Sequence, residues 1–291
     1  MSSVSLFLGA LISGVTIGCI YVLLASGLNL IFGVMELVNF AHGQLLMLGA
    51  YVCYWISTLL GLNPYIAILV AMAIVPLVGI AVERLCFRPV LGTGKLNEIF
   101  VSLGLINIFT YAVVLAWGYN VKIVTSPFDK LSVSVGVISI EFDRIMVIII
   151  VALILVALFV LINKTKIGRA MRATSQNKEA AMLMGININN IYLVSFALGS
   201  ALAATGGALY AIIYNLHPFM GELITIKAFA IIILGGLGSI RGAVAGGLLF
   251  GLAESLAGSF LSPIWEGAVA FAVLIGVLVI RPTGIFGEKG R

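Results

Sequence analysis

Residues 164–187, KTKIGRAMRATSQNKEAAMLMGIN, form the longest polar stretch in a chain that is otherwise dominated by apolar segments. The stretch contains several basic residues and a single acidic residue, Glu179. Apolar segments at 145–162 and 191–214 flank it, and each is long enough to cross a bilayer. Because basic loops between membrane spans stay in the cytoplasm, we expect a cytoplasmic loop over residues 163–190 of a polytopic membrane protein.

The composition of the chain supports this expectation. Of its 291 residues, 62% are hydrophobic and 9% are charged, which excludes an ordinary soluble domain. A lipid environment cannot satisfy a bare backbone, so apolar runs of about 17 to 25 residues indicate helical spans and not a barrel. The predicted fold class is therefore an all-α integral membrane protein, a bundle of about eight (eight to nine) transmembrane helices, some broken by glycines.

The distribution of positive charge predicts the orientation of the chain. Twelve of the 16 Lys and Arg residues fall on the side of the basic loop, and one, Lys227, falls within a span. The twelve are Arg84, Arg88, Lys95, Lys164, Lys166, Arg169, Arg172, Lys178, Arg241, Arg281, Lys289 and Arg291. Lys122, Lys130 and Arg144 lie in the segment 118–144, which is expected outside and whose alternating stretch 131–140 predicts a short hairpin or an extended cover. The C-terminus is therefore predicted in the cytoplasm, whereas the side of the N-terminus stays open.

The second half of the basic loop predicts a short helix. Asn177 can cap it, Glu179 lies in its first turn, where the helix dipole favours an anion, and Gly185 supplies a left-handed stop. A helix of about two turns is marginal alone and needs a partner surface. The small and apolar residues that can face a partner are Ala180, Ala181, Leu183 and Met184. An ordinary amphipathic helix on the membrane surface is the alternative.

Two further segments combine polar residues or glycines with an apolar context. The first contains Asn39, His42, Gly43 and Gln44, at the head of the span 36–60. The second contains Gly235, Gly236, Gly238, Arg241 and Gly242, where a Gly-Gly-x-Gly run predicts an unwound or bent helix. Paired broken helices can line a transport pathway, and tight helix packing is the alternative role of the glycines. For His42 the alternative is an interfacial side chain bonded to backbone.

Nucleotide, metal and catalytic chemistry are not expected in this chain. The run from Gly92 to Lys95 lacks the first glycine and the Ser or Thr of a phosphate-binding loop, and no strand precedes it. Cys19, Cys53 and Cys86 show no metal-ligand or disulfide spacing. No nucleophile surrounds either of the two histidines, so the chain is predicted to be no enzyme and to hold no cofactor or metal.

Three stretches resemble a known family. Glu179-Ala180-Ala181, followed by Gly185, resembles the EAA loop of ABC importer permeases, although no Leu-Pro pair follows the glycine. The phrases IGRAMRATSQNKEAAMLMGI (167–186), VNFAHGQLLMLGAY (38–51) and LGGLGSIRGAVAGG (234–247) resemble the branched-chain amino acid permease family of the LivH type. In that family the loop helix docks on a cytoplasmic ATP-hydrolysing subunit.

The resemblance implies a single transmembrane permease domain over residues 1–291 in a bacterial inner membrane, importing leucine, isoleucine and valine. It implies a second related permease subunit, two cytoplasmic subunits that bind ATP and Mg²⁺, and an external amino-acid-binding protein; no nucleic acid is expected. A permease for urea, short amides or another amino acid is an alternative within the family. An ion-coupled secondary transporter is an alternative of a different class, with Glu36, Lys227 and Glu254 as its candidate ionisable groups.

Overall fold

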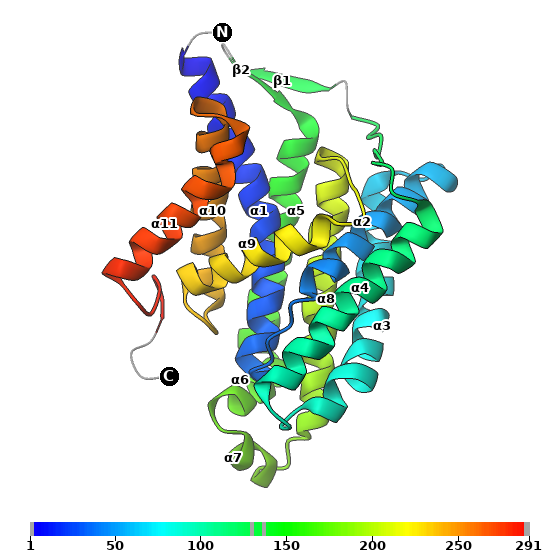
Figure 1. The fold of residues 1–291 in the computed structure, drawn as a ribbon, viewed down its shortest axis with the longest axis vertical. Helices are drawn as coiled ribbons and strands as arrows, with labels where there is room; N and C mark the ends of the chain where they lie inside the picture. The colour runs from blue at the N-terminus through cyan, green and yellow to red at the C-terminus, as the bar shows by residue number, and fades with distance from the viewer. Residues whose placement is uncertain (1–2, 129–130, 136–137, 288–291) are drawn as a thin grey trace.

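A computed structural model describes residues 3–128, 131–135 and 138–287. Lys130, Lys289 and Arg291, which contribute to the charge pattern, lie outside the described residues. The described chain forms eleven α-helices and one two-stranded hairpin (Figure 1). The elements are α1 (Ser3–Met35), α2 (His42–Leu59), α3 (Pro64–Val82), η1 (Glu83–Phe87), η2 (Arg88–Val90), α4 (Lys95–Trp117), β1 (Ser132–Val135), β2 (Ile138–Glu141), α5 (Phe142–Lys164), α6 (Lys166–Gln176), α7 (Lys178–Leu183), α8 (Ile188–Ile213), α9 (Met220–Gly235), α10 (Ile240–Phe260), η3 (Pro263–Trp265) and α11 (Glu266–Ile280).

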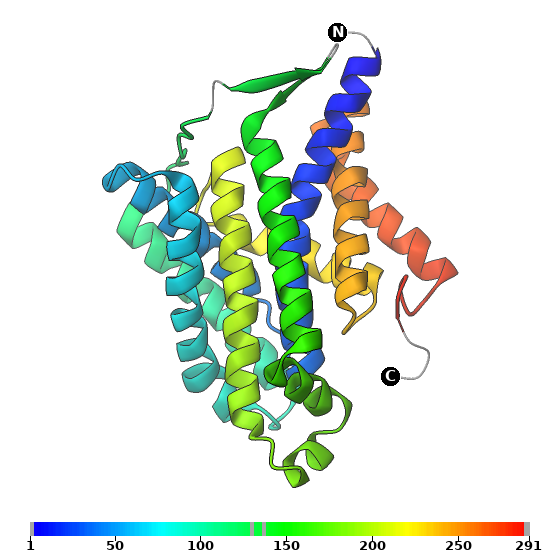
Figure 2. The same ribbon diagram turned by 180° about the vertical axis from the view of Figure 1, so that it is seen from behind.

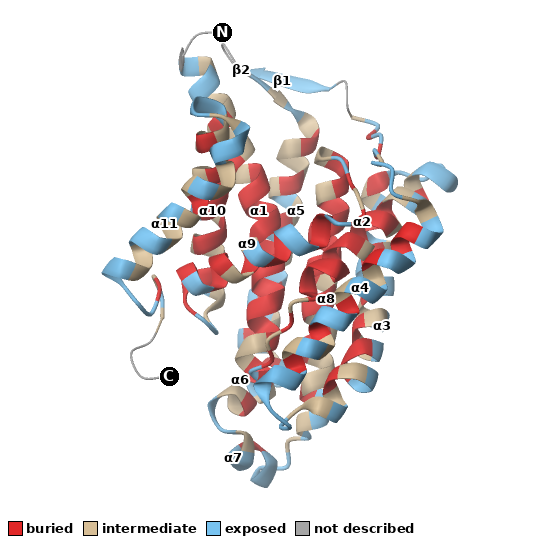
Figure 3. Cartoon of the chain, in the orientation of Figure 1, coloured by how far each residue is buried: buried red, intermediate tan, exposed pale blue. Residues whose placement is uncertain are grey.

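The helix α1 forms the axis of the bundle and packs against α5, α8, α9 and α10. Its contact with α10 is made by small residues, because a Cβ atom on Gly251 would lie 2.5 Å from the Cα atom of Gly18. Close backbone approach through small residues is how helices associate in a membrane. The buried residues concentrate on α1, α2, α8 and α9, whereas α3, α4 and α11 carry much of the exposed surface (Figure 3).

Seven of the helices are long and apolar enough to cross a membrane: α1, α3, α4, α5, α8, α10 and α11, some with their short extensions. The expected eight or nine crossings included α2 and α9 as well. The helix α2 has 18 residues but begins with polar side chains, and α9 has only 16 residues and lies across the bundle in Figure 1. The all-helical membrane fold predicted from the sequence is confirmed.

The two ends of the bundle differ in structure. The antiparallel hairpin β1–β2 lies at the end where the chain begins (Figure 1), and a hairpin is one of the two forms expected over 131–140; Gly136 and Val137 are outside the described residues. The helices α6 and α7 lie at the opposite end, and α5 and α8 connect the two ends (Figure 2). At the α6–α7 end, Arg88 of η2 donates a 3.3 Å hydrogen bond to the carbonyl of Asn189 in the first turn of α8, so the segment after α3 meets the start of α8 there.

Candidate functional site

The helix α7 has the local structure that the sequence predicts. Asn177 ends α6 and caps α7, because its side-chain oxygen accepts a 2.9 Å hydrogen bond from the backbone N–H of Ala180. Gly185 ends the turn with φ +79°, and its N–H donates to the carbonyl of Met182 at 2.9 Å. The next N–H, on Ile186, donates to Ala181 at 3.1 Å. The predicted cap and left-handed stop are both present.

One face of α7 is apolar and exposed. Leu183 is 89% exposed and Met184 is 82% exposed, and Met182 beside them is also exposed. Ala181 differs from the expectation that it faces a partner, because it is only 3% exposed and packs back on the chain. Ala180, Met182, Leu183 and Met184 together form an exposed apolar surface at this end of the molecule, and Met182 is the one that was not expected there from the sequence.

Gly185 allows a matched pair of substitutions. Alanine in the left-handed region costs about 1–2 kcal/mol, whereas asparagine tolerates it. We expect Gly185→Ala to raise amide hydrogen exchange over residues 178–186 by roughly tenfold, and Gly185→Asn to leave it within about twofold. Equal exchange in the two variants, measured by mass spectrometry, would show that the left-handed stop does not hold this helix.

The segment that joins α1 to α2 is a break in the helical bundle. Glu36 has φ +54°, the only positive φ of a non-glycine residue in the described part of the chain. Lys95 donates to its carbonyl, and the Lys178 ammonium of α7 lies 3.9 Å from its carboxylate. Residues 36–41 contain no regular helix, and the Asn39 side chain accepts a 3.0 Å hydrogen bond from the N–H of Ala41. Asn39 therefore shapes the entry to α2.

The first turn of α2 meets the first turn of α9 inside the bundle. The N–H of Gly43 donates to the Thr225 hydroxyl at 3.0 Å, and that hydroxyl donates to the carbonyl of Gly221 at 2.7 Å. A Cβ atom on Gly43 would overlap the Gly221 backbone, so glycine is required at this crossing. Two helix N-termini, the positive ends of two helix dipoles, consequently lie close together.

His42 and Gln44 are fully buried beside this crossing. The His42 side chain lies against Gly27 of α1. The Gln44 side-chain amide lies against Gly221 and has no hydrogen-bond partner among the described residues. An unpaired buried amide is costly, which makes Gln44 a candidate for contact with water or a polar solute.

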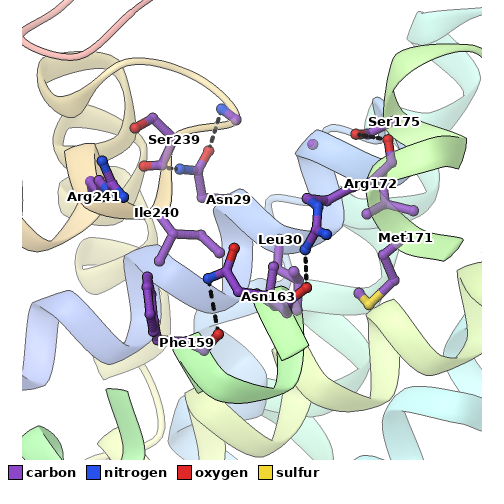
Figure 4. A pocket seen from close by; sticks show the side chains of 14 residues that line it. Asn29, Leu30, Phe159, Asn163, Met171, Arg172, Ser175, Ser239, Ile240 and Arg241 are labelled. Atoms are coloured by element: carbon purple, nitrogen blue, oxygen red, sulfur yellow. Dashed lines mark hydrogen bonds between the residues drawn. The ribbon is translucent and has the colours of Figure 1, made fainter. Parts of the chain in front are cut away.

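The junction between α9 and α10 is the second break. The helix α9 ends at Gly235, Gly236 and Gly238 have φ +103° and +81°, and Ser239 caps α10. Asn29 of α1 holds this turn, since its amide nitrogen donates to the Ser239 carbonyl at 2.7 Å and its oxygen accepts from Gly238 N–H at 2.6 Å (Figure 4). The helix break predicted from the glycine run is therefore present.

A cavity of about 240 Å³ lies beside this turn. Arg241 lines it on the α10 side and Arg172 on the α6 side (Figure 4). Gly242 packs against Gly235, where a Cβ atom on either would overlap the other backbone. The first turn of α2 and the turn at 236–239 are thus located at opposite ends of α9.

Several glycines of the predicted pathway segments pack helices and do not break them. The helix α2 runs continuously through Gly43 and Gly49, and a Cβ atom on Gly49 would overlap the backbone of Ala204 in α8. Gly247 makes a similar contact with Val22 of α1. The expectation of a helix broken by glycines is therefore wrong for the first segment, where α2 is continuous and the break at 36–41 contains no glycine, whereas in the second segment the break at 236–239 does contain glycines.

Asn29 and Thr225 are the polar residues that sequence analysis missed. Each is an isolated polar side chain in an apolar helix, and such residues in a membrane bundle usually bind another helix or a solute. Within the described part of the chain, no group of three His, Cys, Asp or Glu side chains is arranged to hold a metal ion.

A polytopic bundle with helices broken at its centre, and with a short capped helix exposed at one end, defines a membrane transport subunit. The sequence matches the family model described as "Branched-chain amino acid transport system / permease component" over residues 10–278. The chain belongs to this family. It is consequently a multi-pass subunit of an ABC transport system, acting with ATPase and binding-protein partners; it is no enzyme and carries no cofactor of its own.

Relatives span nearly the whole chain. The high-affinity branched-chain amino acid transport permease BraD of Pseudomonas aeruginosa is 34% identical over 97% of this chain and 96% of its own. The high-affinity branched-chain amino acid transport permease LivH of Escherichia coli is 32% identical, also over 97% of this chain and 96% of its own. A Methanocaldococcus jannaschii protein that bears the name LivM is 22% identical over 93% of this chain and 91% of its own. No solved structure matches the chain.

Proposed function

We propose that this chain translocates branched-chain amino acids (leucine, isoleucine and valine) inward across a bacterial inner membrane, driven by ATP hydrolysis on separate subunits. The proposed direction of transport and its ATP dependence rest on one observation: α7 is a capped helix with exposed apolar side chains, and it occurs in a member of the permease family. The solute is supported by the names of the relatives that are 32–34% identical.

The coupling helix in this proposal comprises Asn177, Glu179, Ala180, Ala181, Leu183, Met184 and Gly185. Its apolar tip docks in a groove of an ATPase subunit, and Ala181 anchors it to the permease. Two routes lead from it into the bundle. The helix α6 packs against α1, α5 and α8, and Lys178 reaches the Glu36 carboxylate at the break before α2.

The pathway in this proposal follows the two breaks. Its candidate residues are Asn39, His42, Gly43, Gln44, Gly235, Gly236, Gly238, Arg241 and Gly242. A zwitterionic amino acid needs dipoles for its charged groups and an apolar lining for its side chain. The paired N-termini of α2 and α9, with the unpaired Gln44 amide, offer such dipoles.

The proposed assembly contains two permeases, two ATP-binding subunits and an external amino-acid-binding protein. A second, related permease as partner is supported by the detectable similarity to the LivM protein. We further propose one permease domain over residues 1–291, with the coupling loop 163–190 and the C-terminus in the cytoplasm and the segment 118–144 outside. The positions of α6–α7 and of the hairpin at opposite ends agree with this orientation.

Ion coupling is the alternative of a different class, and the positions of its three candidate groups bear on it. Glu36 lies at the α7 end and is mostly exposed, near Lys178. Lys227 and Glu254 form an ion pair between α9 and α10. If a protonophore abolished uptake while ATP was maintained, ion coupling would replace the ATP-driven mechanism.

The test of the solute uses the complex purified from its native membrane. We expect leucine, isoleucine and valine, presented with the binding protein, to stimulate ATP hydrolysis by the complex, and urea and acetamide to leave it at the basal rate. Mass spectrometry of the same preparation identifies the associated subunits. Stimulation by urea or acetamide alone would assign the chain to the amide-transporting alternative.

A further inference from the structure

A second cavity, of about 500 Å³, lies at the hairpin end of the bundle and is lined by both charged and aromatic side chains. We call it the charged cavity. Its volume falls within the range of about 300–1,000 Å³ that is typical of small-molecule sites. Lys227 and Glu254 line it deep in the bundle, Arg144 and Glu266 line it near the hairpin end, and Ile17 and Ile224 add apolar surface.

The deepest part of the charged cavity is a three-residue network. The Lys227 ammonium of α9 donates to the Tyr21 hydroxyl of α1 at 2.9 Å and to the Glu254 carboxylate of α10. The Tyr21 hydroxyl in turn donates to Glu254 at 3.0 Å. Tyr21 and Glu254 are buried, and burying charge is costly unless the charges are paired. An apolar contact would join these helices without the desolvation cost of two buried charges. We therefore infer that the network serves to bind a ligand.

Glu266 supplies a second carboxylate at the same cavity. It begins α11, is partly exposed, and has no ion-pair or hydrogen-bond partner among the described residues. Gly258 of α10 leaves room for it, because a Cβ atom there would overlap the Glu266 side chain. Near the hairpin end Arg144 already pairs with Glu141 at 2.7 Å. Lys227, Glu254 and Glu266 are thus the charges that a ligand can engage.

We propose that the charged cavity is the entry site for the amino acid zwitterion, an inference that rests on the proposed function and names where the substrate first binds. The substrate inserts into the Lys227–Glu254 pair. Its α-carboxylate accepts hydrogen bonds from Lys227, its α-ammonium donates to Glu254 and Glu266, and its side chain lies against Ile17 and Ile224. A zwitterion supplies a partner to Lys227 and to both carboxylates, whereas a ligand that has only a carboxylate separates Glu254 from Lys227 and gives neither Glu254 nor Glu266 a cation.

The test measures binding of radiolabelled leucine to the ATP-free complex of permease and ATPase subunits in lipid nanodiscs, without the external binding protein. Glu266→Gln removes the free carboxylate without breaking an ion pair, and we expect it to weaken leucine binding about tenfold or more, because a charge-assisted hydrogen bond is lost. Glu266→Asp restores part of the affinity. The control Glu222→Gln, which changes an exposed carboxylate in the first turn of α9, leaves binding unchanged.

A second arm varies the ligand. 4-Methylpentanoate lacks the ammonium group, and we expect it to displace leucine from the unmodified complex about tenfold less well than leucine itself, or not at all. Equal displacement by the two compounds would overturn the proposal. So would unchanged leucine binding in Glu266→Gln, or an equal loss in Glu266→Gln and Glu266→Asp, which indicates a structural role.

The failure of this inference can be told apart from the failure of the proposed function. If leucine stimulates the ATPase of the complex but Glu266→Gln binds it normally, only the entry site is wrong. If no branched-chain amino acid binds to the unmodified complex or stimulates its ATPase, the proposed solute is wrong, and the proposed entry site is then wrong as well. Basal ATPase activity and size-exclusion profile verify that each variant is folded and assembled.

Discussion

Leu183→Asp combined with Met184→Asp is expected to abolish ATP-driven amino acid uptake and to release the ATPase subunits from the permease. Both side chains are almost fully exposed at the tip of α7, so their replacement removes no internal packing. At an interface, by contrast, apolar anchors of this kind contribute about 2 kcal/mol or more each, and a buried aspartate adds a desolvation cost. The two losses together reduce binding by more than about a thousandfold.

The measurement is copurification of the ATPase subunits with the tagged permease, followed by uptake in vesicles. Leu96→Asp is the matched control, because Leu96 is another exposed leucine at the α7 end, in the first turn of α4. It should retain the subunits and at least half of the uptake. Normal uptake by the Leu183 and Met184 double variant would remove α7 from the coupling mechanism.

Gly207→Val is expected to prevent the permease from folding into a monodisperse particle. A Cβ atom on Gly207 would lie far inside contact distance of the Leu46 carbonyl, where α8 crosses α2. Overpacking a core typically costs about 1–3 kcal/mol, and backbone cannot move aside as a flexible side chain can. Because Gly49 of α2 packs equally tightly on Ala204, the crossing cannot shift to relieve the overlap.

Fluorescence-detected size exclusion and a thermal melt in detergent measure this effect. Gly104→Val is the control, since nothing lies within 4 Å of a Cβ atom at that position on the exposed face of α4. It should keep the elution profile and the melting temperature of the unmodified protein. A folded Gly207→Val variant of unchanged melting temperature would contradict the α2–α8 packing described above.

Local features of this protein could be predicted from its sequence because they depend on neighbouring residues. The Asn177 cap, the Gly185 stop and the glycine break after Gly235 each involve a few adjacent positions. The face of α7 that packs inward could not be predicted, since a six-residue helix has too little periodicity to fix the position of Ala181.

Features that depend on long-range contacts could not be predicted. Tyr21 and Glu254 are 233 residues apart, and nothing in either helix indicates their pairing. The contact of Gly43 with Thr225 likewise joins residues that are 182 positions apart, and no local pattern indicates it. The sequence identified Asn39 and Gln44 as unusual, but their different roles emerge only from the three-dimensional packing.

The helix α9 is fastened at both ends, to α2 through Thr225 and to α1 through the turn that Asn29 holds. At 16 residues it is about 24 Å long, shorter than the roughly 30 Å of a hydrocarbon core. If a ligand beside Lys227 and the turn held by Asn29 favour different positions of this helix, linkage is reciprocal: the factor by which the ligand shifts the turn equals the factor by which a change at the turn shifts ligand affinity.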